Sequence, residues 1–407
     1  MMRLTALWCL WILAGWTPFD LESRLYFVHI PKTAGTTLRT LLEMQVSAEE
    51  IYPYRNRKTA KAPVVQELVS GHLPYWLCKD LDPDFEAAFK VTILRDPVER
   101  YLSFLRAKKF QNPEFPNLES VMRERDSPVS KYNSGLIDNA HCRHLAANPL
   151  LEGRELLESA KESLRRIDCV IFFDRFADDV AALFQRLGIS LERQDIPRVN
   201  FTQKEPVSEE LLKEIRQINL LDLELYQYAK THLQMKRNGY RLRTKSFDSL
   251  LTKTTEVDYR FDQPLNGKWW SYRESTGEHV GVYSTYRWVM NQPAIIYFSL
   301  EAGRDYNLSF TAQPLKPEVI PRVRVNGVEF EIFKKNGAPF SLYCGKIPRD
   351  CIGEAPVEIQ FYSSESFLYR DVYPEKMNRN YPPVSFAVSR IHISEIPIFS
   401  VERLCPF

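Results

Sequence analysis

The sequence predicts an α/β unit, with a parallel sheet flanked by helices, followed by an all-β sandwich of the jelly-roll type. Over the first 240 residues, short apolar runs alternate with helix-period segments, which is the pattern of parallel strands joined by helices. After about residue 240, the chain becomes rich in Tyr, Phe, Val, Ile, Pro and turn residues, which indicates antiparallel strands. The length of 407 residues fits more than one domain.

Three short runs predict strands of the parallel sheet: residues 25–30, 91–94 and 168–173. Each is β-branched or aromatic and almost continuously apolar, as strands covered by helices on both faces are. Residues 176–187 have a helical pattern, closed by Gly188 in the position of a C-terminal cap. Residues 208–233 predict one long helix opened by Ser208.

In the second part, the predicted sandwich strands include residues 294–300, 322–325 and 357–362. Asn326 and Gly327 follow one of them, and this dipeptide between apolar runs predicts a tight hairpin. Four aromatic residues could grip sugar rings if they were exposed, although most are expected in the core: Trp269, Trp270, Tyr283 and Trp288. These patterns divide the chain into an apolar leader (1–23), an α/β domain (24–240), a linker (241–258) and a sandwich domain (259–407).

The charge balance and the cysteine content argue against several classes of protein and indicate a cellular compartment. Lys and Arg number 54 against 52 Asp and Glu, so the net charge of +2 argues against a nucleic-acid-coating protein. The seven widely spaced cysteines fit neither a disulfide framework nor a zinc ribbon. Cys344 and Cys351 are expected to be unrelated thiols, the alternative being a pair across a hairpin. We therefore expect a cytoplasmic protein. The alternative is membrane contact through the apolar residues 4–16, although this run is too short to span a bilayer. The same run also fits a signal-like leader or a start codon placed too early.

The segment 27–38, FVHIPKTAGTTL, predicts an anion site. A buried strand runs to Pro31, a tight loop follows, and a helix begins near Thr36. A turn of this kind points backbone N–H groups and a helix N-terminus at one spot. Gly35 permits a close approach of the backbone, and Lys32 adds a positive charge. Because Lys32 precedes the glycine, the loop is not the GxxxxGK[ST] motif of nucleoside triphosphatases.

A second segment, residues 91–106 (VTILRDPVERYLSFLR), predicts a strand followed by a helix. Arg95 stands at the carboxyl end of the strand, and Asp96 and Pro97 are typical of a helix N-cap and first helical position. Ser103 comes eight residues after Arg95, about two turns into the helix.

Together, the two segments resemble sulfotransferases that use 3′-phosphoadenosine-5′-phosphosulfate (PAPS), most of all the branch containing the heparan sulfate 2-O- and 6-O-sulfotransferases. The resemblance covers residues 24–233 and implies a P-loop-like fold with PAPS as the sulfuryl donor. It implies that Arg95 and Ser103 bind the 3′-phosphate. The implied residues of the 5′-phosphosulfate loop are Lys32, Thr33, Gly35, Thr36 and Thr37. Lys32 is expected to stabilise the leaving phosphate.

Sulfuryl transfer to a hydroxyl also needs a base. His72 lies in VSGHLPY, in a loop after a short apolar run, and this element resembles the Gly-His element that supplies the base in the 2-O-sulfotransferase branch. His29 is expected to be a core residue. His141 and His144 bracket Cys142, but no second ligand cluster accompanies them, so no metal is expected.

The sequence therefore predicts a PAPS-dependent O-sulfotransferase that acts on a carbohydrate, with His72 as general base. A basic run could attract an acidic glycan, the alternative being a solvated loop: Arg55, Arg57, Lys58 and Lys61. The rival functions are sulfuryl transfer to a lipid or protein hydroxyl and a P-loop kinase-like nucleotide-binding protein.

Overall fold

The structure is a computed structural model that describes residues 24–53, 63–112, 114–124, 138–148, 150–197, 205–233, 252–271, 273–275, 285–335, 337, 340–373 and 382–396. The expectations for the leader, for the basic run at Arg55 to Lys61, for Tyr283 and for residues 241–251 of the linker lie outside these residues. Within them, no helix has the length and apolarity needed to cross a membrane.

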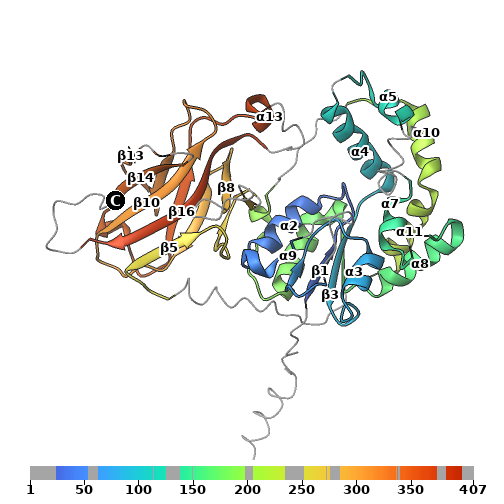
Figure 1. Ribbon diagram of the computed structural model, residues 1–407, viewed down its shortest axis with the longest axis horizontal. Helices are drawn as coiled ribbons and strands as arrows, with labels where there is room; N and C mark the ends of the chain where they lie inside the picture. Colours follow the sequence, from blue (N-terminus) through green and yellow to red (C-terminus); the bar gives the residue numbers. More distant parts are fainter. Residues whose placement is uncertain are drawn as a thin grey trace, which may run out of the picture.

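The first part of the chain contains the predicted parallel sheet (Figure 1). Its strands are β1 (Leu25–Val28), β2 (Leu68–Val69), β3 (Phe89–Leu94) and β4 (Cys169–Phe172). Their order is β2-β1-β3-β4, and every neighbouring pair is parallel. All four strands therefore end at the same edge of the sheet.

Helices cover both faces of this sheet, which explains the continuous apolarity of its strands. On one face lie α2 (Gly35–Glu43) and α9 (Phe176–Arg186), packed on Leu25 and Phe27 of β1. The opposite face packs on Tyr26 and Val28 and is covered by α3 (Tyr75–Leu81), α7 (Ala140–Leu145), α8 (Gly153–Arg165) and α11 (Leu220–His232). Gly188 ends α9 with a φ of 76°, as its capping position predicts.

A separate helical group forms around its own small core, above the sheet in Figure 1: α4 (Pro97–Gln111), α5 (Leu118–Arg123) and α10 (Glu209–Ile218). The prediction of one helix over residues 208–233 is wrong, because α10 and α11 are distinct and meet at Asn219. The Asn219 side chain donates to the Ile215 carbonyl at 2.8 Å and accepts the Asn139 N–H at 3.2 Å. Ser208 caps α10 as expected, accepting the Leu211 N–H.

Two helices cap one another where α7 meets α11. The carboxylate of Asp222, near the start of α11, accepts the N–H groups of His141 and Cys142 in the first turn of α7, both at 2.9 Å. In return, the side-chain oxygen of Asn139 accepts the N–H groups of Leu221 and Asp222. Asn139 has a φ of 46°, the left-handed conformation that asparagine tolerates.

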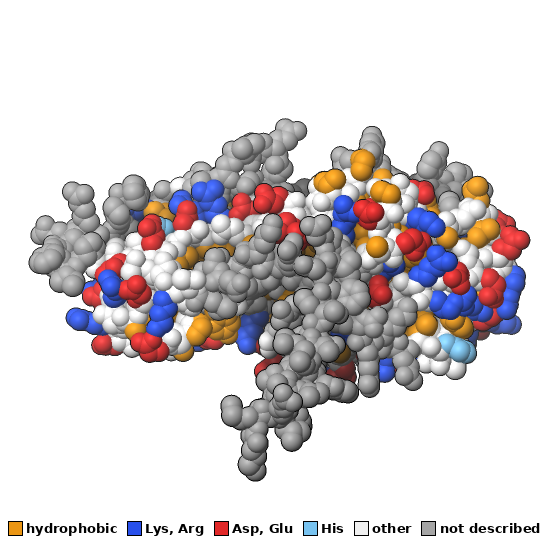
Figure 2. Space-filling view, turned by 90° about the horizontal axis from the view of Figure 1, so that it is seen from below, with side chains coloured by type: hydrophobic (Ala, Val, Ile, Leu, Met, Phe, Trp, Pro, Cys, Tyr) orange, Lys and Arg blue, Asp and Glu red, His pale blue; other side chains and the backbone are white. Residues whose placement is uncertain are grey.

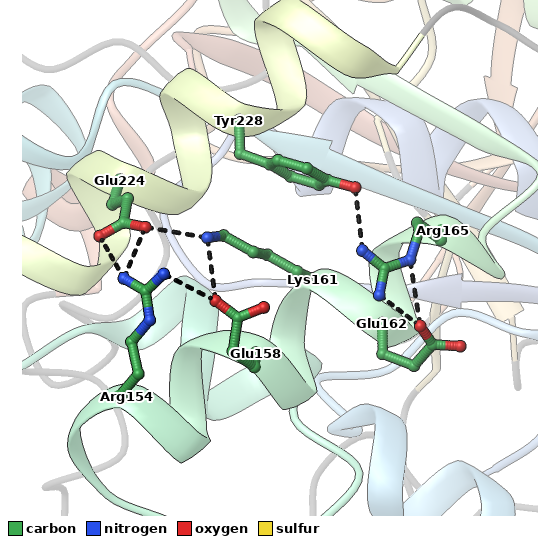
Figure 3. A network of polar contacts seen from close by, with 7 residues as sticks. All are labelled: Arg154, Glu158, Lys161, Glu162, Arg165, Glu224 and Tyr228. Carbon is green, nitrogen blue, oxygen red and sulfur yellow. Dashed lines mark hydrogen bonds and ion pairs between the residues drawn. The ribbon is translucent and has the colours of Figure 1, made fainter.

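Alternating charges join α8 to α11 on the surface (Figure 3). Lys161 lies between Glu158 and Glu224, 3.2 and 2.9 Å from their carboxylates, and Arg154 binds the same two glutamates. On the face shown in Figure 2, Lys and Arg side chains likewise lie beside Asp and Glu side chains. The described surface there carries no continuous field of one sign.

The second part of the chain is the predicted β-sandwich. One antiparallel sheet contains β5 (Glu256–Arg260), β7 (Glu274–Ser275), β8 (Thr285–Met290), β10 (Tyr306–Pro314), β13 (Phe333–Lys335), β14 (Ser341–Ile347) and β16 (Val384–Glu395). The other contains β6 (Gly267–Lys268), β9 (Ala294–Phe298), β11 (Arg322–Val325), β12 (Val328–Glu329) and β15 (Val357–Tyr362). A short helix, α13 (Tyr369–Val372), precedes β16.

Asn326 and Gly327 join β11 to β12 with φ angles of 48° and 83°, as the hairpin prediction requires. Trp270 and Trp288 are core residues, 0% and 4% exposed, which leaves neither of them a sugar-gripping face. Trp269 is partly exposed. Cys344 and Cys351 do not pair, as expected, but Cys344 is disulfide-bonded rather than a thiol, whereas Cys351 is free.

The mutual capping of α7 and α11 predicts two separable contributions at Asn139. Asn139→Gly tolerates the left-handed backbone but loses the acceptor of two N–H groups, so we expect the free energy of unfolding to fall by about 1–2 kcal/mol. Asn139→Ala loses the same acceptor and keeps a β-carbon in the left-handed region, which alanine tolerates less well than asparagine or glycine, so it should lose about 1–2 kcal/mol more than the glycine variant. Urea titrations followed by circular dichroism measure both changes. Equal losses in the two variants would contradict the backbone contribution.

Candidate functional site

The candidate site lies at the edge where the four parallel strands end. After β1 comes the loop with His29 and Lys32, and after β2 the loop with His72. Arg95 directly follows β3, and Phe173 directly follows β4. Because carboxyl ends of parallel strands meet at one edge, residues far apart in the sequence come together there.

The loop after β1 has the backbone geometry of an anion-binding concavity. Lys32 and Ala34 have φ angles of 71° and 73°, and left-handed residues of this kind turn successive N–H groups toward one point. The Thr33 hydroxyl donates to the Ile30 carbonyl at 2.8 Å and so fixes the loop from within. Helix α2 begins directly afterwards, which directs its N-terminus at the same place.

Gly35 has a packing role besides the predicted one, which stays a prediction. It is the first residue of α2, and the left-handed positions belong to Lys32 and Ala34. A β-carbon at Gly35 would lie 2.0 Å from Nε2 of His29, so glycine is needed here because the His29 ring occupies the space of a side chain. Thr36 is partly exposed and Thr37 is buried in the same first turn of α2.

Cations gather beside this loop. The Arg95 guanidinium donates to the Lys32 carbonyl at 3.2 Å, pairs with Glu99 at 3.4 Å, and lies 4.3 Å from the centre of the Phe173 ring. Burial, followed by the charges of Arg95 and Arg100, lowers the pKa of Lys32. Three like charges held together in a partly buried region favour the binding of an anion.

Helix α4 begins as its sequence predicts. The Asp96 carboxylate accepts the Glu99 N–H at 3.0 Å, and Pro97 occupies the first position. The Glu99 side chain pairs with Arg95. Ser103 lies partly exposed at the end of the second turn, and its contact with a phosphate stays a prediction.

His72 is held in one tautomer. Its Nδ1 lies 3.2 Å from the backbone oxygen of His29. A carbonyl oxygen only accepts hydrogen bonds, so Nδ1 carries the proton and Nε2 keeps the lone pair. The two imidazole rings also face each other, with centres 3.9 Å apart.

Both histidines are neutral in this environment. Burial lowers the pKa of His72 to about 4, against the hydrogen bond to His29, while Arg39 and Lys32 lower it further. Burial and then His72 hold the pKa of His29 well below its ordinary value. A pKa of about 4 lies below the near-neutral value that a general base at working pH would have, so the imidazole of His72 is in its basic form over the whole neutral range.

His141 is part of the fold rather than of this edge. It is fully buried, and its Nδ1 lies 3.3 Å from the Asp222 carboxylate. Burial acts to raise the pKa of Asp222, but His141 and Arg100 hold it below its ordinary value. Among the residues that the structure describes, no group of three or more His, Cys, Asp or Glu side chains is placed to hold a metal ion.

Three contributors to the site escape sequence reasoning: His29, Arg100 and Phe173. His29 is buried, as expected, but its carbonyl fixes the His72 tautomer. Arg100 is fully buried on α4, and Phe173 is 39% exposed beside Arg95. The only available signal was positional, since His29 and Phe173 lie near the carboxyl ends of predicted strands and Arg100 lies one turn into the helix after Arg95.

Comparison with solved structures gives several matches, each of low sequence identity. A sulfotransferase from Alicyclobacillus acidocaldarius is 15% identical, and the match covers 53% of this chain and 97% of that one, with a TM-score of 0.31. The C-terminal CBM6 of LamC from Zobellia galactanivorans is 7% identical over 34% of this chain and 98% of that one, with a TM-score of 0.23. The GH26-CBM35 β-(1,4)-mannanase of Podospora anserina is 11% identical over 38% of this chain and 30% of that one, with a TM-score of 0.24.

No curated protein sequence matches the chain. A family model does: that of the sulfotransferase family matches residues 19–229, more than half of the 407 residues. The matched segment contains the whole parallel sheet, the loop of Lys32 and the residues around His72 and Arg95. The chain belongs to the sulfotransferase family.

Proposed function

We propose that this protein is a PAPS-dependent O-sulfotransferase that transfers a sulfuryl group to a hydroxyl of a carbohydrate, in the manner of the heparan sulfate 2-O- and 6-O-sulfotransferase branch. One arrangement carries the proposal: the cation-lined loop of Lys32 and the His72 imidazole, with a free Nε2 lone pair, stand at the same edge of the sheet. Membership of the sulfotransferase family supports the donor, because that family generally uses PAPS.

The donor fits the cations at this edge. PAPS carries a 5′-phosphosulfate and a 3′-phosphate, both anionic. The loop of Lys32, Thr33, Gly35, Thr36 and Thr37 would hold the 5′-phosphosulfate with backbone N–H groups, hydroxyls and the Lys32 ammonium. Arg95 would hold the 3′-phosphate with Ser103. The charges that lower the pKa of Lys32 come from Arg95 and Arg100, so bound phosphate would relieve a repulsion that the protein itself contains.

Transfer then requires a balanced movement of one proton and one sulfuryl group. The acceptor hydroxyl gives its proton to Nε2 of His72 as its oxygen forms a bond to sulfur. The bond between sulfur and the bridging oxygen of the 5′-phosphate breaks, and that oxygen carries away the electron pair. Lys32 would neutralise the charge that develops on it, so Lys32 and His72 would serve the two ends of an in-line displacement.

A carbohydrate acceptor rests on the motif likeness to the heparan sulfate branch. The Gly71-His72 element resembles the one that supplies the base in the 2-O-sulfotransferases, and this resemblance supports a glycan hydroxyl as the acceptor. A screen with labelled PAPS over sulfated glycans, neutral glycans, lipids and a protein hydroxyl identifies the acceptor class. Preferential labelling of a lipid or protein would replace the glycan assignment.

Binding of the donor product tests the role of Arg95. Adenosine 3′,5′-bisphosphate at one hundred times its Kd should stabilise the wild-type protein by about 2.7 kcal/mol. At equal concentration, AMP and ATP should stabilise it far less. Arg95→Ala should weaken bisphosphate binding by about 1.5–3 kcal/mol, the contribution of a charge-assisted contact. Thermal-shift titrations measure these effects.

Arg154→Ala is the matched control, because Arg154 lies in the α8–α11 surface network (Figure 3). It should leave bisphosphate binding unchanged. Equal stabilisation of the wild type by ATP and by the bisphosphate would favour the kinase-like alternative and contradict the donor assignment.

Turnover tests His72. His72→Ala should lower turnover by about 10²–10⁴-fold, the usual contribution of a positioned base, while bisphosphate affinity stays within about 0.5 kcal/mol of the wild type. His232→Ala, which removes an exposed histidine of α11, should keep full turnover. Radiolabel transfer from PAPS measures the rate. Normal turnover in His72→Ala, with loss in His144→Ala, would reassign the base.

The pH profile tests the protonation state. The neutral imidazole is the active form, so the rate should rise with pH through the pKa of His72 and then level off. Because that pKa is about 4 in the free protein, kcat/KM should already be level by about pH 6. Bound donor phosphates favour the imidazolium and should shift the rise in kcat to higher pH. An inflection of kcat/KM near pH 7 would contradict the burial of His72.

A further inference from the structure

The sandwich contacts the C-terminal end of α2, the helix that begins directly after the Lys32 loop. Directly after α2, the Met44 carbonyl accepts the N–H of Leu265 at 2.8 Å, and the Ala48 N–H donates to the Asp262 carbonyl at 2.7 Å. The Met44 side chain, 3% exposed, packs within the sandwich core itself. In Figure 1, α2 lies on the side of the sheet that faces β8 of the sandwich.

Arg273 of the sandwich adds further hydrogen bonds to the end of α2. Its guanidinium donates to the Glu43 carbonyl at 3.1 Å and to the Val46 carbonyl at 2.8 Å. These carbonyls lie at and beyond the C-terminal end of α2, where a positive charge is favourable to the helix dipole. Arg273 is 7% exposed, so the contact is shielded from water.

The side chain of Glu43 contacts the loop that carries His72. Glu43 is fully buried, and its carboxylate accepts the Ser70 hydroxyl at 2.7 Å and lies 3.6 Å from Nε of Arg39. Ser70 is 3% exposed and comes two residues before His72 in the same loop. A buried hydroxyl bound to a carboxylate is a strong, directional contact, so the position of Glu43 constrains the loop that presents His72.

We propose that Glu43 is a positioning residue for His72 and that the sandwich fixes it through Arg273. The chain of contacts is continuous: Arg273 holds the end of α2, Glu43 at that end holds Ser70, and Ser70 sets the loop of His72. The inference rests on the proposed function of His72, but it concerns the geometry of the imidazole and has its own readout. The groups that face His72 are His29 after β1, Arg39 on α2 and Lys32 in the first loop.

The test is nitrogen-15 NMR of the histidine rings in the full-length protein, combined with kinetics. In the wild type, His72 should be the Nδ1–H tautomer with a pKa near 4. In Ser70→Ala the tautomers should mix, the pKa should move toward 6.5, and kcat should fall about tenfold. Bisphosphate affinity should change by less than about threefold, because the nucleotide contacts are not part of this chain of contacts.

Two further variants locate the cause. Glu43→Gln keeps an acceptor oxygen for Ser70, so it should produce a smaller change in the same direction. Arg273→Met, a change in the sandwich, should cause the same mixing of the His72 tautomers as Ser70→Ala. Arg273→Lys keeps a positive charge and should retain part of the wild-type Nδ1–H tautomer. The matched control is Lys268→Met, which breaks the 2.9 Å ion pair with Asp195 that also joins the two parts but does not touch α2. It should leave His72 unchanged.

The outcomes separate the two hypotheses. An unchanged tautomer and kcat in Ser70→Ala, or equal effects of Arg273→Met and Lys268→Met, would overturn the positioning role. Loss of kcat and of bisphosphate affinity together would show general damage to the fold and would also overturn it. If the wild type neither binds the bisphosphate nor transfers label, the proposed function fails, and the NMR of His72 still decides the positioning role.

Discussion

The packing of the His29 ring against Gly35 is the constraint on which the site depends. The ring fills the space that a side chain at the start of α2 would need, so helix and histidine can approach only because residue 35 is glycine. The same histidine receives Nδ1–H of His72 on its carbonyl and lies against the second ring. One residue therefore sets both the start of the helix below the Lys32 loop and the tautomer of the candidate base.

Electrostatics give this edge its chemical character. Arg95, Arg100 and Lys32 lie together although their positive charges repel one another, and Asp222 offsets part of the charge of Arg100. Like charges held together in this way favour the binding of an anion beside them. The neighbouring histidines are neutral chiefly because they are buried, and the charges of Arg39 and Lys32 lower the pKa of His72 further.

Sequence reasoning recovered the elements whose signals are local. The parallel strands, the start of α4 at Asp96 and the Asn326-Gly327 hairpin follow from apolar runs, caps and turn residues. The break at Asn219 was missed, because the apolar period continues through it and the partner that breaks the helix, Asn139, is eighty residues away. Contacts such as Glu43 with Ser70 are equally invisible in one sequence, since nothing near either residue marks its partner.

Ala34 carries a consequence for anyone who engineers this protein. An L-residue other than glycine in the left-handed region is disfavoured by about 1–2 kcal/mol, so the loop holds conformational tension at that position. Glycine at residue 34 would relieve this strain, and the greater freedom of glycine in the unfolded chain would offset part of the gain. Ala34→Gly would also let the Lys32 loop adopt more backbone conformations. Only a fraction of the molecules would then have the loop conformation that binds the donor. At the methyl group of Ala34, therefore, a gain in thermal stability would come with a less ordered donor-binding loop.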